Sequence, residues 1–374
     1  MVYSIVLVVL LLLGLFCFHI EDEKTKAFVF VSFLILWLLS GIRYQDGYSD
    51  FRNYYIGMIR AHSLSYTQIL SQEESFLQFI RKIISEIVPD PQGYFFVTSF
   101  IVVGVTLRFG YKYINHVFLY VIFFYCAFSY FTFNNIVRQG VAVSFVTIAY
   151  TYLVRKKKLL FLFYVLLSVL IHRSAIIAIV MLFLVNLRIS RRSLFGYITF
   201  IALMIVANRP ITQLLIIYIY PDYATSGYGT TSAAYYYVVY VALALIAVIQ
   251  YARYYDCFDD NWVIRGNRQL IENEAVDGNR VYCLAINGTI VYGVFVLLSF
   301  LNMLIFFRMS LYFVPCLMVT LDHALNAMPE EKRSGYLFAC FIFAIGIFIV
   351  LNMNGKLIPT PYTVFWDFPF RMTY

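Results

Sequence analysis

The sequence predicts an all-α integral membrane protein that crosses the bilayer many times. Of its 374 residues, 62% are hydrophobic and only 13% are charged, and the mean hydropathy is +0.78. A soluble globular chain is about 45–50% apolar and about 25% charged, so the composition excludes that class. Phe (37) and Tyr (33) are abundant, which is typical of chains with many membrane–water boundaries. The basic residues behind the net charge of +8 lie in short loops between apolar runs, which indicates topology signals and anionic lipid rather than nucleic acid.

Ten apolar runs give the expected membrane helices in order. A helix needs about 20 apolar residues to cross the hydrocarbon core of a bilayer. Runs of about this kind occur at 2–20, 26–42, 93–109, 113–131, 135–153, 195–207, 234–252, 281–301, 311–328 and 334–351. We expect each of them to form one membrane segment.

A longer apolar stretch, 159–187, is broken in its middle by His172 and the two polar residues that follow it. One straight helix would place an imidazole and a guanidinium near the bilayer centre, which is costly. Basic clusters flank both ends, and the positive-inside rule then places both ends on the inner side. The stretch therefore predicts two half-length helices, 159–171 and 174–187, each about 20 Å long, that meet at a recessed, outward-facing tip.

The loops complete the expected topology, which has about twelve membrane segments in a single membrane domain, residues 1–374. With the amino terminus outside, the densest Lys and Arg clusters all fall inside, as the positive-inside rule requires. Loop 43–92 then lies outside, and its amphipathic stretch 76–84 predicts an interfacial helix. Loop 253–280 lies inside and mixes acids and bases without periodicity, which indicates a solvated linker.

Four arginines, each from a different segment, are expected near the outer leaflet: Arg43, Arg138, Arg173 and Arg308. Guanidinium groups are always charged and bind phosphate oxygens in a forked geometry, so the set predicts an anionic ligand, with a lipid diphosphate as the natural candidate. The alternative for any one of them is snorkelling to lipid headgroups. For His172, the place at a helix break and the basic neighbours favour a functional role over that of a satisfied buried histidine.

Other polar features allow fewer conclusions. Asp50 is either a functional carboxylate or a simple partner for its own loop or for Arg52. None of the six cysteines forms a CxxC pair, which argues against a zinc site and against a disulfide framework. No Asp-x-Asp motif with an evident diphosphate role occurs, so we expect neither a metal nor another cofactor.

Several short motifs follow one another along the chain. They are Arg43, Gly47, Asp50, Tyr54 and Glu74, then Asn135-x-x-Arg138-Gln139, then His172-x-Ser174, and finally Arg308 with Tyr312-Phe313. Each motif alone is common, but their order and their shared side of the membrane form a pattern. Over about residues 40–315 this pattern resembles the EpsG family of polytopic membrane proteins, within the Wzy-like O-antigen and exopolysaccharide polymerases.

The resemblance implies an enzyme of the bacterial inner membrane with its active site facing the periplasm and a fold similar to that of GT-C glycosyltransferases. Such an enzyme acts on oligosaccharide repeats linked to undecaprenyl diphosphate. It transfers the growing glycan from its lipid diphosphate to a hydroxyl of the next lipid-linked repeat. Its expected partners are this lipid-linked glycan, membrane lipid and a chain-length regulator, with no nucleic acid.

The chemistry implied by the resemblance assigns roles to the motif residues. Departure of the diphosphate needs stabilisation of negative charge, which the four arginines supply. The acceptor hydroxyl needs a general base; His172 is preferred, because flanking cations favour its neutral form, and Asp50 and Glu74 are the alternatives. Five residues take supporting roles: Tyr54, Asn135, Gln139, Ser174 and Tyr312.

Three other functions compete with the polymerase. A flippase for the same lipid-linked glycan predicts internal repeats and basic residues deep in a central cavity, but the sequence shows no repeat and its polar set favours one leaflet. An O-antigen ligase has similar chemistry with a different acceptor. A membrane O-acyltransferase is usually marked by a lone membrane histidine, and the outward arginine set fits it less well.

Overall fold

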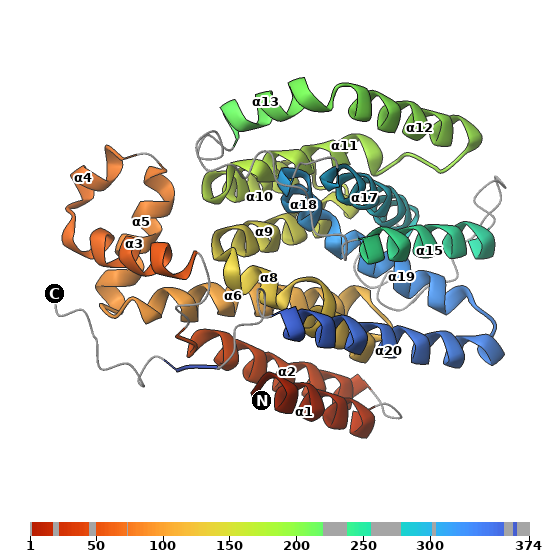
Figure 1. The fold of residues 1–374 in the computed structure, drawn as a ribbon, viewed down its shortest axis with the longest axis horizontal. Coiled ribbons are helices and arrows are strands. Elements are labelled where there is room, and N and C mark those ends of the chain that lie inside the picture. The colour runs from red at the N-terminus through yellow and green to blue at the C-terminus, as the bar shows by residue number, and fades with distance from the viewer. Residues whose placement is uncertain are drawn as a thin grey trace. The chain divides into compact units, whose positions relative to one another are not determined.

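A computed structural model describes most of the chain, in the residue ranges 2–17, 22–44, 50–72, 74–219, 238–255, 278–300, 304–354 and 362–364. Within these ranges the regular structure is entirely helical, and the only strand-like feature is an isolated antiparallel bridge between Arg43 and Val364. Figure 1 shows the helices in chain order. The predicted all-α class is therefore confirmed.

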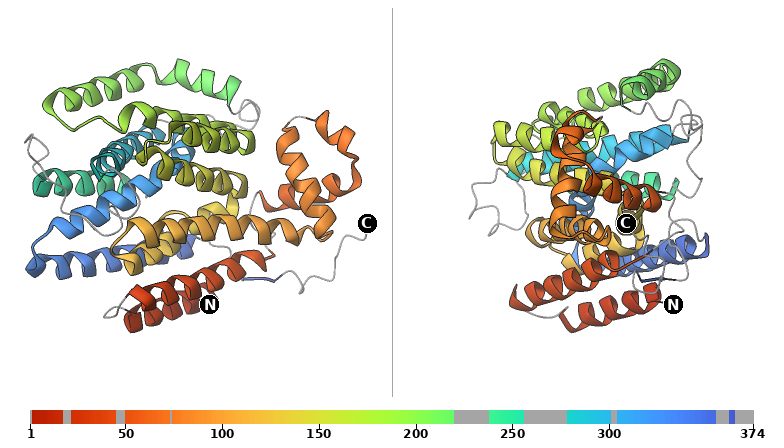
Figure 2. Two further views of the ribbon diagram at one scale, coloured as in Figure 1. Left: turned by 180° about the vertical axis from the view of Figure 1, so that it is seen from behind. Right: turned by 90° about the vertical axis from the view of Figure 1, so that its left-hand side faces the viewer.

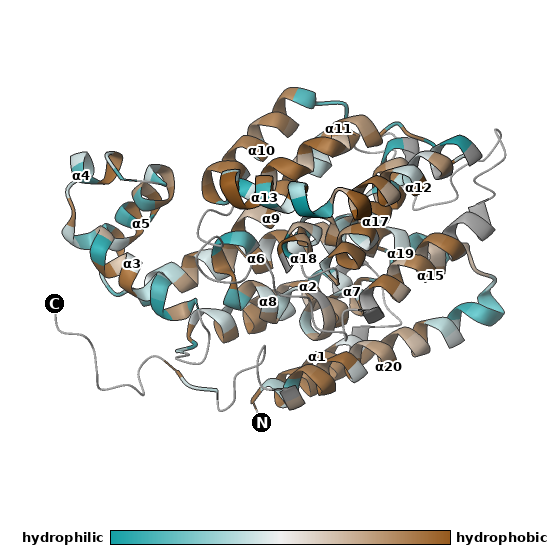
Figure 3. Ribbon diagram, turned by 45° about the horizontal axis from the view of Figure 1, so that its top comes forward, coloured by the Kyte–Doolittle hydropathy of each residue, from teal (hydrophilic) through white to brown (hydrophobic). Residues whose placement is uncertain are grey.

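Five helices are long and apolar enough to cross a membrane, which identifies a membrane-embedded protein. Four of these spans lie in single helices and one runs through two helices. They are α6 (Gln92–Tyr113), α9 (Val137–Val154), α17 (Gly278–Ser299), α18 (Leu304–Ser310) continued by α19 (Val314–Ala327), and α20 (Glu330–Asn354). Figure 3 shows the apolar character of α17 along most of its length.

Other predicted runs also form helices outside this set of spans. These are α1 (Val2–Cys17), α2 (Asp22–Gly41), α7 (Val117–Phe123) with a π-helical turn (Phe124–Phe128), and α15 (Val238–Tyr255). Length and composition identify five spans, or six with one bent pair, so the total of about twelve stays a prediction. Most of the predicted inner loop 253–280 lies outside the described residues, as does Gly47.

The predicted break at His172 is confirmed. Helix α10 (Lys158–Ile171) ends just before this residue, whose backbone is extended, with φ −149° and ψ 109°. A 3₁₀ helix, η2 (Arg173–Val180), follows and leads into the single turn of α11 (Met181–Leu184). At about 1.5 Å per residue, α10 is about 21 Å long, which is shorter than the hydrocarbon core of a bilayer. It packs against η2.

One predicted span, 195–207, is part of a larger bent pair that the sequence reading missed. Helix α12 (Arg191–Val206) and helix α13 (Asn208–Tyr218) are bent by 76° at Ala207. Pro210 lies in the first turn of α13. Because proline has no backbone N–H and its ring crowds the preceding turn, one continuous helix through this position is disfavoured.

Loop 43–92 contains three helices rather than one. Helix α3 (Phe51–Ser63) packs against α5 (Ser75–Ile87), and the single turn α4 (Tyr66–Leu70) joins them. Helix α5 includes the predicted amphipathic stretch 76–84. Figures 1 and 2 show this helical group beside the amino-terminal end of α6. A core of buried side chains holds the group there: Phe51, Tyr54, Met58, Ile84, Tyr94, Phe95 and Val137.

The chain divides into two compact units. The first holds residues 1–112, 116–144 and 337–374, and the second holds 113–115 and 145–336. In the second unit, α17 packs against both α15 and α19. The predicted site residues are shared between the two units, so each unit has its own cluster.

Candidate functional site

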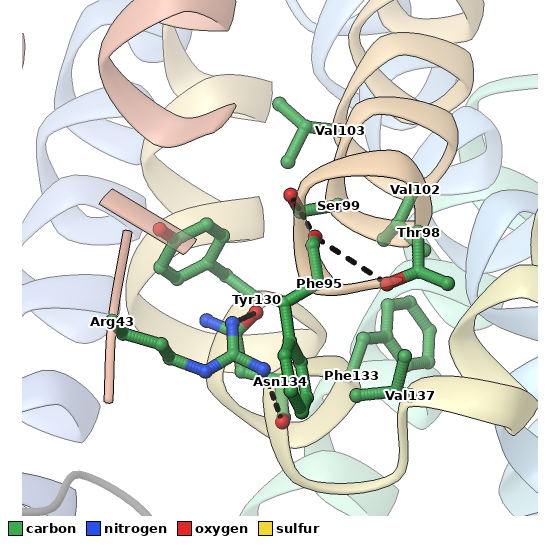
Figure 4. A pocket seen from close by; sticks show the side chains of 10 residues that line it. All are labelled: Arg43, Phe95, Thr98, Ser99, Val102, Val103, Tyr130, Phe133, Asn134 and Val137. Carbon is green, nitrogen blue, oxygen red and sulfur yellow. Dashed lines mark hydrogen bonds between the residues drawn. The ribbon is translucent and has the colours of Figure 1, made fainter. Parts of the chain in front are cut away.

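Arg43 lies just beyond the end of α2 and is buried, with 2% of its surface exposed. Its Nη1 donates to the carbonyl oxygen of Ser40 (2.9 Å) and to Oδ1 of Asn134 (2.7 Å), and its Nη2 donates to the carbonyl oxygen of Asn134 (2.6 Å). Figure 4 shows this contact. Asn134 lies near the end of α8 (Tyr130–Asn135), where helix carbonyls lack intrahelical partners. Arg43 therefore ties the ends of α2 and α8 together.

A small cavity lies beside this contact. Arg43, Thr98, Ser99, Tyr130 and Asn134 give it a polar side, and the rest of its lining is apolar (Figure 4). Its volume is about 10 Å³, which is room for about one water molecule. In this form the cavity is too small for a diphosphate, so the contacts of Arg43 with Asn134 and Ser40 are its principal interactions.

The backbone around Arg43 is also held in place. The buried Gln92 amide donates to the carbonyl oxygens of Gly41 and Arg43. On the other side, the bridge to Val364 brings the carboxyl-terminal part of the chain against Arg43. The sequence analysis assigns no role to Gln92 or Asn134. Neither can be recognised from its neighbours in the sequence, because the residues that each one contacts are distant in the chain.

Arg138 lies in the first turn of α9, after a break in the helix at Ile136. Its Nη2 forms an ion pair with Oε1 of Glu74, and the two side chains are 26% and 33% exposed. Glu74 precedes α5 in a left-handed conformation, with φ 56° and ψ 37°. A non-glycine residue in this conformation costs about 1–3 kcal/mol, so the surrounding contacts hold Glu74 there. The ion pair joins α5 to α9 and is within reach of a ligand.

Tyr54 and Tyr94 pack beside this ion pair, with ring centroids 5.9 Å apart. Burial raises the pKa of Tyr54 well above its ordinary value, the charge of Asp50 raises it further, and a hydrogen bond with the Arg138 backbone opposes the shift. Tyr54 is therefore protonated at any physiological pH. The half-buried Asp50 occupies the N-cap position of α3, but its side chain makes no capping hydrogen bond.

Arg81 of α5 was not identified from the sequence. It is 6% exposed, and its guanidinium carbon lies 6.0 Å from the ring centroid of Tyr54 and 5.5 Å from that of Tyr94. The amphipathic pattern of α5 places a charged residue on the solvent side by default. Only the packing of α5 against α3 shows that this guanidinium is inside.

The second unit contains a cluster around His172. The hydroxyl of Ser174, which is fully buried, lies 3.1 Å from His172 Nδ1 and 2.9 Å from the hydroxyl of Tyr312. Tyr312 belongs to a 3₁₀ turn, η5 (Leu311–Phe313), between α18 and α19. Arg173 is exposed next to His172, and Arg308 lies about one turn before Tyr312. Helix η2 contacts both α18 and η5.

The structure brings two subsets of the predicted residues together. One is Arg138 with Glu74 and Tyr54, and the other is His172 with Ser174 and Tyr312. Arg43 is held by Asn134, a residue outside the predicted site set. Gln139 is buried in α9, with 1% of its surface exposed.

The four arginines divide between the two units, with Arg43 and Arg138 in the first and Arg173 and Arg308 in the second. Their convergence on one ligand stays a prediction. Within the described ranges, no three His, Cys, Asp or Glu side chains are grouped as metal ligands would be, and independence from metal likewise stays a prediction.

The whole chain was compared with known proteins. The profile of one family, described as the EpsG family, matches residues 26–363. No curated protein and no solved structure matches the chain. The match covers both units and all of the predicted site residues, so it extends beyond the stretch of about residues 40–315 that carries the motifs.

Proposed function

The chain belongs to the EpsG family, a family of Wzy-like polysaccharide polymerase-related proteins, and from this premise we propose that it polymerises lipid-linked glycan repeats. The substrate is an oligosaccharide repeat on undecaprenyl diphosphate, at the periplasmic leaflet of the bacterial inner membrane. The anomeric C–O bond to the diphosphate breaks, and a new C–O bond forms to a hydroxyl of the next repeat. The hydroxyl proton passes to a base, and undecaprenyl diphosphate leaves. A GT-C-like arrangement of about twelve segments belongs to the same proposal.

The observation that carries the proposal is the chain of hydrogen bonds from His172 through Ser174 to Tyr312. The bond at one imidazole nitrogen decides which nitrogen carries the proton and fixes the plane of the ring. The hydroxyl of Ser174 is neutral, so its bond at Nδ1 orients the ring without stabilising a permanent imidazolium. We assign Nε2 of His172 as the general base for the acceptor hydroxyl.

The arginines supply the complementary charge. Arg138 is the principal contact of the leaving diphosphate, because its guanidinium is partly exposed and already holds one carboxylate, that of Glu74. Arg173 and Arg308 flank the histidine cluster and add positive charge there. The buried Arg43 acts mainly by holding Asn134 and the end of α8, two residues before α9 begins. Charged donors placed where negative charge develops are commonly the largest single contribution to such catalysis.

The remaining predicted residues take secondary roles. Glu74 and Asp50 are the alternative bases, but the ion pair of Glu74 with Arg138 favours His172. Asn135 and Gln139 lie next to the start of α9 and support Arg138. A chain-length regulator is an expected partner of the outer face.

The test is surface glycan length in a strain that depends on this chain. Arg138→Ala and His172→Ala should each reduce the surface glycan to single repeats, visible as loss of the ladder on a gel. Arg60→Ala and His62→Ala are matched controls, because both residues lie at the end of α3, away from the two clusters, and should leave the ladder intact.

The other outcomes separate the competing functions. Complete loss of external glycan, including single repeats, would indicate a flippase. Polymer that accumulates without transfer to its final acceptor would indicate a ligase. A normal ladder in both variants would contradict the assignment of these residues.

A further inference from the structure

Arg81 is a buried cation that lacks an anionic partner in the described part of the chain. Among the residues that the structure describes, its only hydrogen bond is a long one, 3.4 Å from Nη1 to the side-chain oxygen of Gln78. Its Nε has no partner among the described residues, and its other contacts are the faces of Tyr54 and Tyr94. Buried charges in proteins are normally paired, because desolvating an unpaired ion costs several kcal/mol.

The next residue of the same helix shows that α5 can satisfy a buried cation. Lys82 is 8% exposed, about as buried as Arg81. Its Nζ donates to the carbonyl oxygen of His62 (2.9 Å) and lies 3.3 Å from a carboxylate oxygen of Glu86. Among the described residues, α5 therefore has an anionic partner for Lys82 but none for Arg81. The side chain of Arg81 lies instead against the tyrosines beside Arg138.

Neutral groups border the guanidinium of Arg81: the side chain of Gln78, the tyrosine rings and the backbone of Gly57. Gln78 and Arg81 lie three positions apart on α5, so they share one face of the helix. Glu74, at the N-cap of α5, pairs with Arg138, and Arg81 lies about two helical turns further along the chain. The half-buried Gln78 offers Arg81 a neutral oxygen at the limit of hydrogen-bond length. Gly57 makes room for the guanidinium, since a Cβ there would lie 2.7 Å from Nη1.

We propose that Arg81 forms a second oxyanion site, separate from Arg138, for an anionic group of a lipid-linked substrate. The inference rests on the proposed function, because an enzyme that joins two lipid-linked repeats binds two diphosphates. Gln78 holds the site in the free protein and moves aside when the oxyanion binds. The oxyanion is the diphosphate of the second carrier lipid or the carboxylate of an acidic sugar, and the two sources share the forked recognition that guanidinium groups provide.

The experiment measures anion-dependent thermal stability of the purified full-length protein in detergent. Inorganic pyrophosphate and glucuronate are titrated separately into Arg138→Gln protein, which removes the first site. Adding Arg81→Met should raise the half-saturating concentration of one of these anions by about 10-fold to 100-fold, the range expected for losing a charged hydrogen bond. Arg81→Lys should give an intermediate effect, because it keeps the charge and loses the fork.

Lys82→Met in the same background is the matched control. It should lower the unfolding midpoint without ligand, because the groups that Lys82 contacts lose their partner. The anion response should stay unchanged. Arg81→Met should not lower that midpoint, because it removes an unpaired buried charge. If the response to pyrophosphate depends on Arg81, the bound anion is the diphosphate of the carrier lipid. If the response to glucuronate depends on Arg81, it is the carboxylate of an acidic sugar.

The proposal is overturned if neither anion response depends on Arg81, or if Arg81→Met only lowers the midpoint as Lys82→Met does. Failure of the proposed function would appear elsewhere, as a normal glycan ladder in Arg138→Ala and His172→Ala cells. The two failures are therefore distinguishable.

Discussion

The two site clusters are held together by different forces. In the first unit, the cluster at the start of α9 is made of charges: Arg138 pairs with Glu74, and Arg81 lies buried nearby against the rings of Tyr54 and Tyr94. In the second unit, the cluster at the break after α10 is made of neutral groups, with His172, Ser174 and Tyr312 joined by hydroxyl hydrogen bonds. The proposed function assigns the two clusters different tasks: the first binds anions and the second moves a proton.

The division has a physical basis. A guanidinium holds its charge at any physiological pH, so it can bind a phosphate but cannot accept a proton. An imidazole changes its charge within the physiological range, and a carboxylate close to it would favour the protonated form. The neutral hydroxyl partner at the His172 break therefore suits a base, and the permanent charge of the Arg138 guanidinium suits an anion site.

The largest expected effect comes from the neutral cluster. His172→Ala should lower the rate of polymerisation by about 10²–10⁴-fold, as expected for loss of a general base. The measurement is the initial rate of glycan extension in membranes supplied with lipid-linked repeat. A rate within about twofold of wild type would remove His172 from the mechanism and leave Asp50 or Glu74 as the base.

The charged cluster should show a slightly smaller effect. Arg138→Gln should reduce the same rate by about 10²–10³-fold, the loss typical of removing one charged donor from a transition state. Arg138→Lys should recover part of the activity, because charge is restored without the fork. Equal rates for the Gln and Lys variants would show that charge at this position does not matter.

Asn134→Ala tests the hydrogen bonds that hold Arg43 in place. It leaves the buried Arg43 without its Oδ1 acceptor and should lower the free energy of unfolding by about 1–3 kcal/mol. The midpoint of thermal unfolding reports the change. Asn53→Ala, at an exposed position of α3, is the control and should leave the midpoint unchanged.

The smallest effect should come from Tyr312→Phe, which removes one hydroxyl and keeps the ring. The hydrogen bond to Ser174 is worth about 0.5–1.5 kcal/mol, which corresponds to a fall in rate of about 2-fold to 13-fold if all of it appears in the barrier. Ser174→Ala breaks both bonds at once and should cost more. An equal loss in the two variants would indicate that Tyr312 acts alone.

The sequence predicted the parts of the structure that have local causes. The break at His172 follows from polar residues in an apolar stretch, and the amphipathic helix in loop 43–92 follows from its periodicity. The bend between α12 and α13 also has a local cause in Pro210, but the apolar run was taken to end at residue 207.

The partners within the site could not be predicted, because they depend on packing between distant segments. Arg43 and Asn134 are 91 residues apart, and Arg138 and Glu74 are 64 apart. Arg81 was missed for a related reason. A basic residue on an amphipathic helix is expected at the surface, and only the contact of α5 with α3 and α6 places it inside.

The contacts of residues 362–364 with the chain near Arg43 constrain the order in which this part of the protein can fold. Tyr362 donates its hydroxyl to the carbonyl oxygen of Leu39 (2.8 Å), and the Tyr44 amide donates to the carbonyl oxygen of Thr363 (2.9 Å). The surroundings of Arg43 are thus completed by residues that lie about 320 positions later in the chain. A nascent chain therefore cannot complete this corner until residues 362–364 have been synthesised.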